Sequence, residues 1–329
     1  MTVGTAAARD GLLSVERLTI VARPSTTLVD GVSFHVNRGE VFGICGESGS
    51  GKTMSVLALV GLNPPTTTAS GHAGFGSIDL LSASPKEMRH IRGRRIGFVF
   101  QDPLTSLHPM FTVGQLLTEH VRWHLHLSAQ AANAKALELL EIVRIPGGRT
   151  ALNTYPHQFS GGMRQRIAIA VALACGPELL IADEPTTSLD VTVQAGILRL
   201  LDELRREAKL SVVLISHNLA VMAALADRLA VFYSGRIVEA GPTADVLSHP
   251  RHPYTAGLLA ALPARSRQFN ALSPISGMAP SPTARPSGCA FHPRCSFALP
   301  ECRAQIPELG LVGRDRFLAC PPDPLAASA

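Results

Sequence analysis

Short apolar runs and longer segments with helical periodicity alternate along the chain, and this pattern predicts an α/β fold. The run from Val41 to Cys45 is predicted to be a buried strand. A glycine-rich loop separates it from a helix that is expected to start at Lys52 and to end near Leu62. A second buried strand is predicted in the segment ELLIADEP at 178–185, which ends in two carboxylates.

Two further helices are predicted between these strands, in the segments TVGQLLTEHVRWHLHL and SAQAANAKALELLEIV. They begin at Thr112 and Ser128, which are residue types that commonly cap a helix N-terminus. We expect them to form an all-helical lobe at about residues 102–176. Three histidines lie in the first of these segments: His120, His124 and His126. His120 and His124 are i and i+4 neighbours, but no cysteine accompanies them, so a surface or groove role is favoured over a metal site. Phe111 and Trp123 could equally be core residues.

Composition and charge exclude several classes of protein. A chain of 329 residues with 46% hydrophobic and 17% charged residues can bury one large core and an appended module. The N-terminus does not have the pattern of a secretory signal, and the most apolar segment, 167–175, is about half the length needed to cross a bilayer. The net charge is +5, but only the stretch 89–95 concentrates basic residues, so we expect a solvated basic face and no nucleic-acid partner.

The segment FGICGESGSGKT at 42–53 has the order and spacing of a P-loop. Its glycines let the backbone turn tightly enough to direct several N–H groups at phosphate oxygens. Lys52 is expected to reach the β- and γ-phosphates, and Thr53 to ligate Mg²⁺. The predicted phosphate-binding residues are Gly46, Glu47, Ser48, Gly49, Ser50, Gly51, Lys52 and Thr53.

The two carboxylates that end the second strand fit the chemistry of nucleotide hydrolysis. Asp183 is placed to hold Mg²⁺ through water, and Glu184 to orient or deprotonate the water that attacks the γ-phosphate. In the segment FSGGMRQR at 159–166, Ser160 and the backbone N–H groups of Gly161 and Gly162 predict a second phosphate-binding helix start. One γ-phosphate is already bound by the first loop, so the second start must serve another nucleotide.

In this combination of motifs the sequence resembles the ATP-binding cassette (ABC) ATPases. The resemblance runs from about residue 12 to residue 320. It implies a P-loop ABC ATPase core with the helical subdomain inserted, and two ATPase subunits that pair head to tail around two ATP molecules. It implies that Gln101 senses Mg²⁺ and links it to the membrane partner, and that His217 contacts the γ-phosphate. Asp190, which ends TSLD, would lie at the subunit junction with Ser160, near the ATP of the opposing subunit.

Two departures from the family pattern concern the nucleotide site. Members of the family usually stack adenine on an aromatic residue near the end of the first strand, where this chain has Ala22 and Arg23. Arg23 could instead provide cation–π stacking on the base. The second motif has Phe159 and Met163 where many members have leucine and glutamine, but its serine and both glycines are intact.

The segments HPYTAGLLAALP and ADEPTTSLDVTVQ resemble the peptide and nickel importer branch of the family. This resemblance implies a peripheral ATPase on the cytoplasmic face of the cell membrane that powers uptake of dipeptides or oligopeptides. The implied partners are a second ATPase subunit, a paralogue, together with two membrane-spanning permease subunits and an extracytoplasmic solute-binding protein. Nickel or another small solute is an alternative substrate. A soluble ABC ATPase outside transport, and a redox sensor that merely binds nucleotide, are alternatives of other classes.

Four of the six cysteines lie close to the end of the chain: Cys289, Cys295, Cys302 and Cys320. A proline- and serine-rich segment precedes them, and few apolar residues accompany them. Disulfides are disfavoured in a compartment that supplies ATP, so a metal acting as the core is expected. The wide spacings suit four thiolates on an iron–sulfur cluster better than the C-x₂₋₄-C pattern of zinc sites. Some peptide-importer ATPases resemble this tail and carry a [4Fe–4S] cluster there; structural Zn²⁺ is the alternative.

The expected organisation follows from these motifs. It comprises an ATPase domain at 1–250, a helix and Pro/Ser-rich linker at 251–288, a four-cysteine module at 289–320 and a tail at 321–329.

Overall fold

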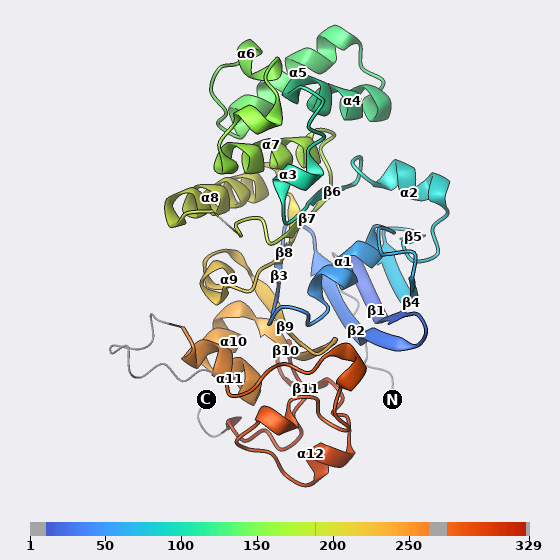
Figure 1. The fold of residues 1–329 in the computed structure, drawn as a ribbon, viewed down its shortest axis with the longest axis vertical. Helices are drawn as coiled ribbons and strands as arrows, with labels where there is room; N and C mark the ends of the chain where they lie inside the picture. Colours follow the sequence, from blue (N-terminus) through green and yellow to red (C-terminus); the bar gives the residue numbers. More distant parts are fainter. Residues whose placement is uncertain (1–10, 188, 263–274, 327–329) are drawn as a thin grey trace. The chain divides into compact units, whose positions relative to one another are not determined.

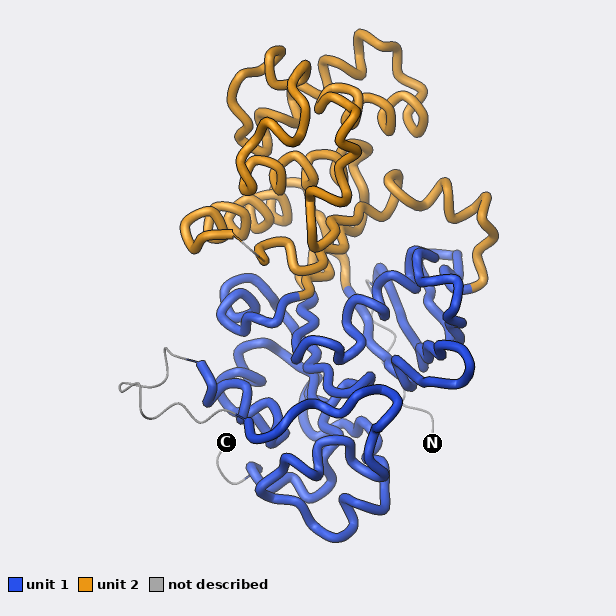
Figure 2. Tube along the Cα trace, in the orientation of Figure 1, with its two compact units in different colours: residues 1–36, 42–81, 216–329 blue, residues 37–41, 82–215 orange. Residues whose placement is uncertain are grey.

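The structure is a computed structural model that describes residues 11–187, 189–262 and 275–326. The chain divides into two compact units, which Figure 2 draws in different colours. Unit 1 contains residues 1–36, 42–81 and 216–329, and unit 2 contains residues 37–41 and 82–215. Part of the predicted Pro/Ser-rich linker, residues 263–274, lies outside the described residues.

Unit 1 contains an antiparallel sheet in the order β2-β1-β4-β5 (Figure 1). Its strands are β1 (Gly11–Ala22), β2 (Thr26–Asn37), β4 (Thr67–Phe75) and β5 (Ile78–Asp79). The register between β1 and β4 shifts between Glu16 and Thr19, where Arg17 has a φ of 50°. Val15 and Leu18, on either side of this bulge, are both buried. The bulge therefore shifts the alternation by one residue and keeps apolar side chains on the core face.

Unit 1 also contains strands in the order β11-β12-β10-β9-β3. They are β3 (Val41–Cys45), β9 (Arg228–Tyr233), β10 (Arg236–Pro242), β11 (Gly310–Gly313) and β12 (Arg316–Leu318). β3 and β9 are parallel, whereas the other neighbours are antiparallel. Every residue of β3 is buried, as its apolar run predicts.

The helices of unit 1 are short and flank these strands. They are α1 (Lys52–Leu59), α9 (Leu219–Leu225), α10 (Thr243–Ser248), α11 (Pro253–Ala260) and α12 (Glu301–Ala304), with 3₁₀ turns η4 (Pro282–Ala284) and η5 (His292–Arg294). α1 ends three residues before the predicted Leu62 because Gly61 adopts a φ of 59°. The Leu62 N–H donates to the Leu57 carbonyl at 2.9 Å, which closes the helix in a glycine C-cap.

Unit 2 contains parallel strands in the order β8-β7-β6. They are β6 (Ile96–Val99), β7 (Leu179–Asp183) and β8 (Ser211–Ile215), and both β7 and β8 are buried throughout. The helices are α2 (Pro85–Ile91), α3 (Pro103–Ser106), α4 (Val113–Leu125), α5 (Ala129–Ile142), α6 (Arg149–Leu152), α7 (Gly161–Leu173) and α8 (Val191–Ala208), with a 3₁₀ turn η1 (Pro156–Gln158).

The helical lobe of unit 2 begins its two main helices where the sequence predicts. The Thr112 side chain caps α4 by accepting a bond from the Gln115 N–H. The Gln115 side-chain oxygen in turn accepts a bond from the Thr112 N–H at 2.8 Å. Ser128 caps α5 through a bond from the Ala131 N–H at 3.2 Å. Both predicted starts are confirmed, because these caps depend only on residues within one helical turn.

The C-terminal segment after residue 288 is joined to the sheet of unit 1. β12 pairs with β10, and Arg316 forms an ion pair with Glu239, a fully buried carboxylate of β10. Phe291 and Leu318 are each 3% exposed. The segment therefore shares the core of unit 1, although its sequence alone predicts only a small core of its own.

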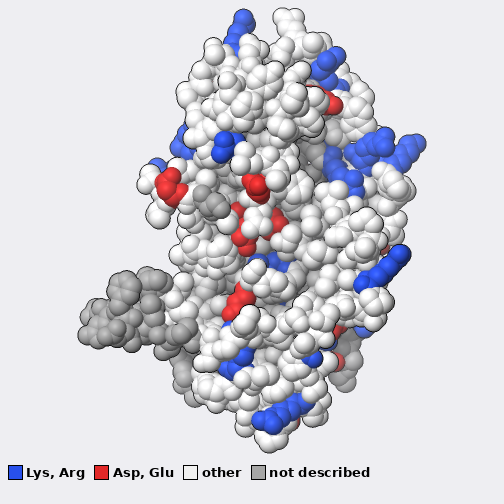
Figure 3. All heavy atoms as spheres, viewed as in Figure 1, with Lys and Arg blue, Asp and Glu red and all other residues white. Residues whose placement is uncertain are grey.

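On the face drawn in Figure 3, charged side chains are distributed unevenly. Figure 3 shows a group of Lys and Arg side chains over α2, the helix that contains the first residues of the basic stretch 89–95. Two arginines of this stretch are bonded inside unit 2: Arg94 to the Cys175 carbonyl at 3.0 Å and Arg95 to the Glu178 carboxylate at 2.7 Å. Across the described ranges, no helix combines the length and the apolar character needed to cross a membrane.

Candidate functional site

The predicted phosphate-binding loop, residues 46–51, joins β3 to α1 in unit 1. Two of its positions require glycine. A Cβ on Gly46 would stand 2.2 Å from the Phe232 carbonyl oxygen, and its φ is +143°. Gly51, the N-cap of α1, has a φ of +99°, and no described side chain bonds to this cap. The sequence thus produces a tight turn that leads directly into a helix N-terminus.

Lys52, the first residue of α1, is buried and its side chain folds back onto this loop. Its Nζ donates to the carbonyls of Gly46 and Glu47 at 2.9 and 2.8 Å. Burial raises the pKa of the neighbouring Cys45 thiol to about 12, with a smaller opposing effect from Lys52, so this thiol is protonated at physiological pH. A lysine amine and a helix N-terminus therefore belong to the same tight turn, an arrangement suited to anions.

Two other predicted residues of unit 1 are connected to this loop through the backbone. Thr53 follows Lys52 in the first turn of α1. His217 is exposed and follows Ser216, whose N–H donates to the carbonyl of Ile44 at 3.1 Å. Because Ile44 belongs to β3, the backbone next to His217 is anchored to the strand that precedes the phosphate-binding loop.

In unit 2, the predicted acidic pair ends β7. Asp183 is 3% exposed, and Glu184 is half-buried with a φ of 47°. A left-handed conformation costs roughly 1–3 kcal/mol for a residue other than glycine, and such strain concentrates at functional sites. The Glu184 carboxylate accepts a bond from Gln101 Nε2 at 3.2 Å. The structure therefore brings two of the predicted catalytic residues into contact.

Thr187 is a member of this site that sequence reasoning did not identify. Its Oγ1 donates to Glu184 Oε2 at 2.8 Å, so one carboxylate oxygen accepts bonds from both Gln101 and Thr187. The spacing of three residues is compatible with a turn, and the Thr187 N–H donates to the Glu184 carbonyl at 3.1 Å. That turn could have been suspected from the strand-end position of Glu184, but the side-chain bond could not.

The second predicted phosphate-binding helix start, at Ser160, is the N-terminus of α7. The Ser160 hydroxyl accepts a bond from the Met163 N–H at 3.4 Å. Asp190 caps α8 in the same way, by accepting from the Val193 N–H at 2.9 Å. A Cβ on Gly162 would stand 2.4 Å from Val193, so the first turns of α7 and α8 touch at a point that requires glycine. The structure thus places Ser160 and Asp190 at neighbouring helix N-termini.

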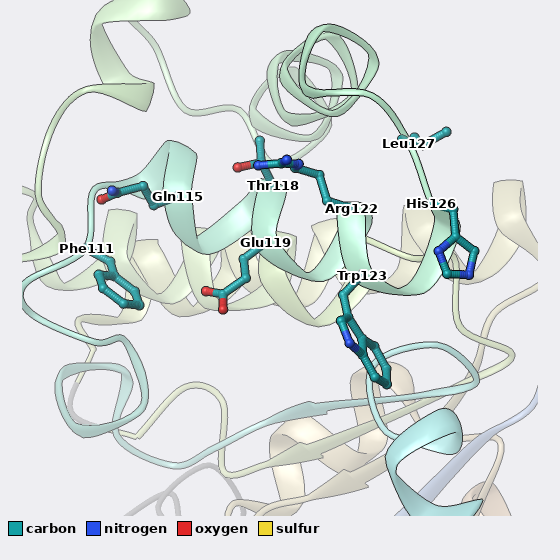
Figure 4. Close-up of a pocket in the computed structure, with 8 residues that line it drawn as sticks. All are labelled: Phe111, Gln115, Thr118, Glu119, Arg122, Trp123, His126 and Leu127. Carbon is teal, nitrogen blue, oxygen red and sulfur yellow. The ribbon is translucent and has the colours of Figure 1, made fainter. Parts of the chain in front are cut away.

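Unit 2 also carries a groove along α4, with a volume of about 610 Å³. Figure 4 shows its lining residues: Phe111 lies at one end, and Trp123, His126 and Leu127 lie toward the other. Phe111 and Trp123 are 37% and 46% exposed, so neither is an ordinary core residue. His126 lines the groove, as a surface role predicts.

The four C-terminal cysteines are neighbours in unit 1 and none is disulfide-bonded. The Cys289 N–H donates to the Cys302 carbonyl at 2.8 Å. Burial, with a smaller contribution from the other three cysteines, raises the pKa of the Cys320 thiol to about 12. In the described parts of the chain, however, no group of three or more Cys, His, Asp or Glu side chains is arranged to hold a metal ion. The four cysteines therefore lie near one another, but among the described residues their side chains are not arranged as a metal site.

Comparison of the sequence with known families gives two matches. The ABC transporter family matches residues 29–187, which include the phosphate-binding loop and the acidic pair. The family described as "Oligopeptide/dipeptide transporter, C-terminal region" matches residues 238–302. The second match covers three of the four clustered cysteines.

Similar proteins include several bacterial transport subunits. A probable peptide ABC transporter ATP-binding protein (y4tR) from Sinorhizobium fredii is 46% identical over 298 residues, which cover 90% of this chain and 89% of that protein. The dipeptide transport ATP-binding protein DppD of Haemophilus influenzae is 44% identical, covering 92% and 93% of the two chains. The protein of the same name from Escherichia coli is 42% identical, covering 94% and 96%.

Solved structures resemble the fold over about two thirds of the chain or more. A dimeric structure of the ATP-binding cassette MJ0796 in a post-hydrolysis state with ADP and Pi has a TM-score of 0.63 and 27% identity, covering 70% of this chain and 98% of that one. CbiO1 from Clostridium perfringens, part of the ABC transporter complex cbiONQ, has a TM-score of 0.63 and 28% identity, covering 73% and 91%.

Proposed function

Because this chain belongs to the ABC transporter family of ATP-binding proteins, an ATPase family with a mixed α/β P-loop fold, we propose that it powers the uptake of dipeptides or oligopeptides. The observation that carries the substrate class is the match of residues 238–302 to the C-terminal region of oligopeptide and dipeptide transporters. Relatives at 42–46% identity over most of their length are peptide or dipeptide transport proteins by name, which supports the same class.

In this proposal, residues 46–53 bind the phosphates of ATP. Lys52 would exchange its two carbonyl partners for the β- and γ-phosphate oxygens, and Thr53, Gln101 and Asp183 would hold the Mg²⁺ that neutralises phosphate charge. Glu184 orients the attacking water, and its bond to Gln101 links the water site to the Mg²⁺ site. His217 contacts the γ-phosphate.

In this proposal the helix N-terminus at Ser160 binds the phosphates of a different ATP molecule. We assign Ser160, Gly161, Gly162 and Asp190 to the ATP held by a second ATPase subunit, a paralogue that pairs head to tail with this chain. The two N-termini of α7 and α8 meet at Gly162, which supports a single surface built to receive the partner's nucleotide. ATP binding closes the pair, and hydrolysis reopens it.

We propose that the motion is transmitted to membrane-spanning permease subunits; the similar protein CbiO1 is itself part of an ABC transporter complex. In the proposed assembly two permease subunits bind the helical lobe from the cytoplasmic side of the membrane, and an extracytoplasmic solute-binding protein delivers the peptide. The groove along α4, with the exposed rings of Phe111 and Trp123, supports the lobe as the docking region.

We also propose that Cys289, Cys295, Cys302 and Cys320 hold a [4Fe–4S] cluster, with structural Zn²⁺ as the alternative. Cys289, Cys295 and Cys302 lie close enough to Cys320 to raise the pKa of its thiol, so the four cysteines are a donor set suited to a soft metal centre, which would remove the protons and draw the sulfurs together. The sulfurs need to approach further than in the structure, because the described residues include no preformed metal site. In this proposal the role of the metal is to stabilise the folded C-terminal segment.

Peptide uptake by cells tests the transport function. Cells lacking the gene are supplied with wild-type chain or with Lys52→Ala, and uptake of radiolabelled dipeptide, longer peptide and nickel is measured. We expect wild-type chain to restore peptide uptake and Lys52→Ala to restore none. Restored uptake of nickel alone would replace the peptide substrate with nickel. If the chain copurified with no membrane-spanning subunit and affected neither uptake, the transport assignment would be wrong.

A further inference from the structure

The phosphate-binding loop is held by a residue from the C-terminal cysteine segment. Glu47 occupies a position of the G-x-x-x-x-G-K-T pattern whose side chain the pattern does not specify. Its two carboxylate oxygens accept bonds from both terminal nitrogens of Arg294, at 2.8 and 3.0 Å. The pair spans 247 positions of sequence and lies entirely within unit 1. Two parallel bonds between a guanidinium and a carboxylate define direction as well as distance.

Arg294 is itself fixed from several sides, and its side chain is 7% exposed. Its Nε donates to the Ser276 carbonyl at 3.0 Å, and its guanidinium lies over the rings of Tyr233 and Phe291. One terminal nitrogen also donates to the Tyr233 hydroxyl at 3.3 Å. Because these contacts fix the guanidinium independently of Glu47, it holds Glu47 in place rather than following it.

The backbone of Glu47 makes hydrogen bonds to several parts of the loop and its surroundings. Its N–H donates to the Tyr254 hydroxyl at 2.8 Å, and its carbonyl accepts from Lys52 Nζ at 2.8 Å. The same carbonyl accepts from the Ser50 N–H at 3.3 Å. A shift of Glu47 would therefore move the lysine and the N–H groups that face the phosphates.

The turn that carries Arg294 is bonded to two of the clustered cysteines. Arg294 ends η5 and directly precedes Cys295, whose N–H donates to the His292 carbonyl at 3.3 Å. The His292 N–H donates to the Cys289 carbonyl at 3.0 Å. The position of the guanidinium thus depends on how the cysteine segment is folded.

We propose that Arg294 is a positioning residue for the phosphate-binding loop: through Glu47 it makes nucleotide affinity depend on the folded C-terminal cysteine segment. The inference rests on the proposed ATP site at residues 46–53 and adds a residue of this chain that acts on that site without touching the nucleotide. It holds whichever metal, if any, the cysteines bind.

The test is nucleotide binding to the purified full chain, titrated with a fluorescent ATP analogue in Mg²⁺. We expect Arg294→Gln to raise the dissociation constant about tenfold, within the usual range of coupling between sites. Arg294→Lys keeps the charge but loses the bidentate geometry, so about a threefold increase is expected. Arg303→Gln, an exposed arginine of the same segment, is the matched control and should bind like wild type.

A double-mutant cycle separates positioning from general loosening of the segment. Glu47→Gln alone should weaken binding about as much as Arg294→Gln, and the double variant should be no weaker than the worse single variant, because both remove one interaction. Glu47→Gln leaves the cysteine segment intact, so it tests the proposal even if Arg294→Gln unfolds. Wild-type affinity in Glu47→Gln, or additive losses in the double variant, would overturn the proposal.

Lys52→Ala distinguishes this proposal from the assignment beneath it. If Lys52→Ala weakens binding while Glu47→Gln and Arg294→Gln do not, the ATP site stands and the positioning role fails. If Lys52→Ala has no effect, the ATP site itself is wrongly assigned.

Discussion

The side-chain amide of Gln101 donates to the carboxylate of Glu184 across 3.2 Å, and the two residues lie 83 positions apart in sequence. Both follow buried parallel strands, since β6 ends at Val99 and β7 ends at Asp183. Neighbouring parallel strands present their carboxyl ends at one edge, where loops form binding sites. The bond is therefore a direct consequence of the order β8-β7-β6.

Substitution of Glu184 should separate binding from hydrolysis. Glu184→Gln keeps the size of the side chain and removes the base, so we expect ATP binding to persist and turnover to fall by about 10²-fold or more. Phosphate release by the assembled transporter is the measurement. Glu207→Gln, at an exposed position of α8, is the control. Wild-type turnover in Glu184→Gln would remove Glu184 from the catalytic site.

Thr187 should contribute less than Glu184. Thr187→Val removes the hydroxyl that donates to Glu184 Oε2 at 2.8 Å while keeping the branched shape of the side chain. We expect turnover to fall about tenfold with ATP binding unchanged, since the carboxylate keeps its bond from Gln101. Equal turnover in Thr187→Val and wild type, measured in the same phosphate-release assay, would show that this bond does not orient the carboxylate.

Substitution of Ser160 tests the assignment of a shared site. Ser160→Arg places a large cation at the N-terminus of α7, where the partner's γ-phosphate is proposed to bind. Binding of nucleotide to the single chain should stay close to wild type, whereas ATP-dependent pairing with the second ATPase subunit should be lost. Size-exclusion chromatography of the mixed subunits with ATP measures pairing, and Gln130→Arg on the exposed face of α5 is the control. Normal pairing of Ser160→Arg would mean that the two sites are not shared.

Local patterns allowed the strand, the loop and the helix starts to be predicted, because each depends on residues a few positions apart. The strand Val41–Cys45 and the caps Thr112 and Ser128 are of this kind. Glu47 and Arg294 could not be paired from the sequence, because 247 positions separate them and neither position has a pattern of its own.

The C-terminal segment shows the same limit. The sequence of this segment contains few apolar residues that could form a core. Two of them, Phe297 and Ile306, are exposed in the structure. The stabilising contacts come instead from pairing of β12 with β10 and from Arg316 on the buried Glu239. Edge pairing and a buried ion pair leave no periodic signal in a short strand, so the sequence does not reveal them.

Acidification should destabilise unit 1 through His252. Burial lowers the pKa of this histidine to about 3, and its Nδ1 accepts a bond from the Tyr254 N–H. The unfolded chain therefore binds more protons between pH 6.5 and pH 3, and stability is lost as the pH falls through that interval. At pH 5 the loss from this group is about 2 kcal/mol.

Chemical denaturation at pH 7.5 and pH 5 measures this effect. His252→Asn can still cap α11 but does not titrate, so the pH dependence of its unfolding free energy should be smaller by about 2 kcal/mol. The backbone N–H of His252 donates to the Glu239 carboxylate, and this bond does not involve the side chain that is replaced. It is therefore expected in both proteins. An identical pH dependence in the two proteins would show that His252 is not the group responsible.

The clustered cysteines give the last prediction. If Cys289, Cys295, Cys302 and Cys320 hold a [4Fe–4S] cluster, anaerobically purified protein should be brown, absorb broadly near about 400 nm and contain about four irons per chain. Cys295→Ser should bleach the colour, whereas Cys175→Ala, at a buried cysteine of unit 2, should keep it.

Loss of the metal should loosen only part of the segment. β12 remains paired with β10 without any metal, so new protease cleavage in Cys295→Ser is expected at residues 288–302 and not at 316–318. Because Arg294 lies in the loosened part, nucleotide affinity should fall about as far as in Arg294→Gln and no further. Zinc in place of iron, found by elemental analysis of anaerobic protein, would change the metal and keep the structural role. Protein without either metal, with a protease-resistant 288–302 segment in Cys295→Ser, would contradict both forms of the proposal.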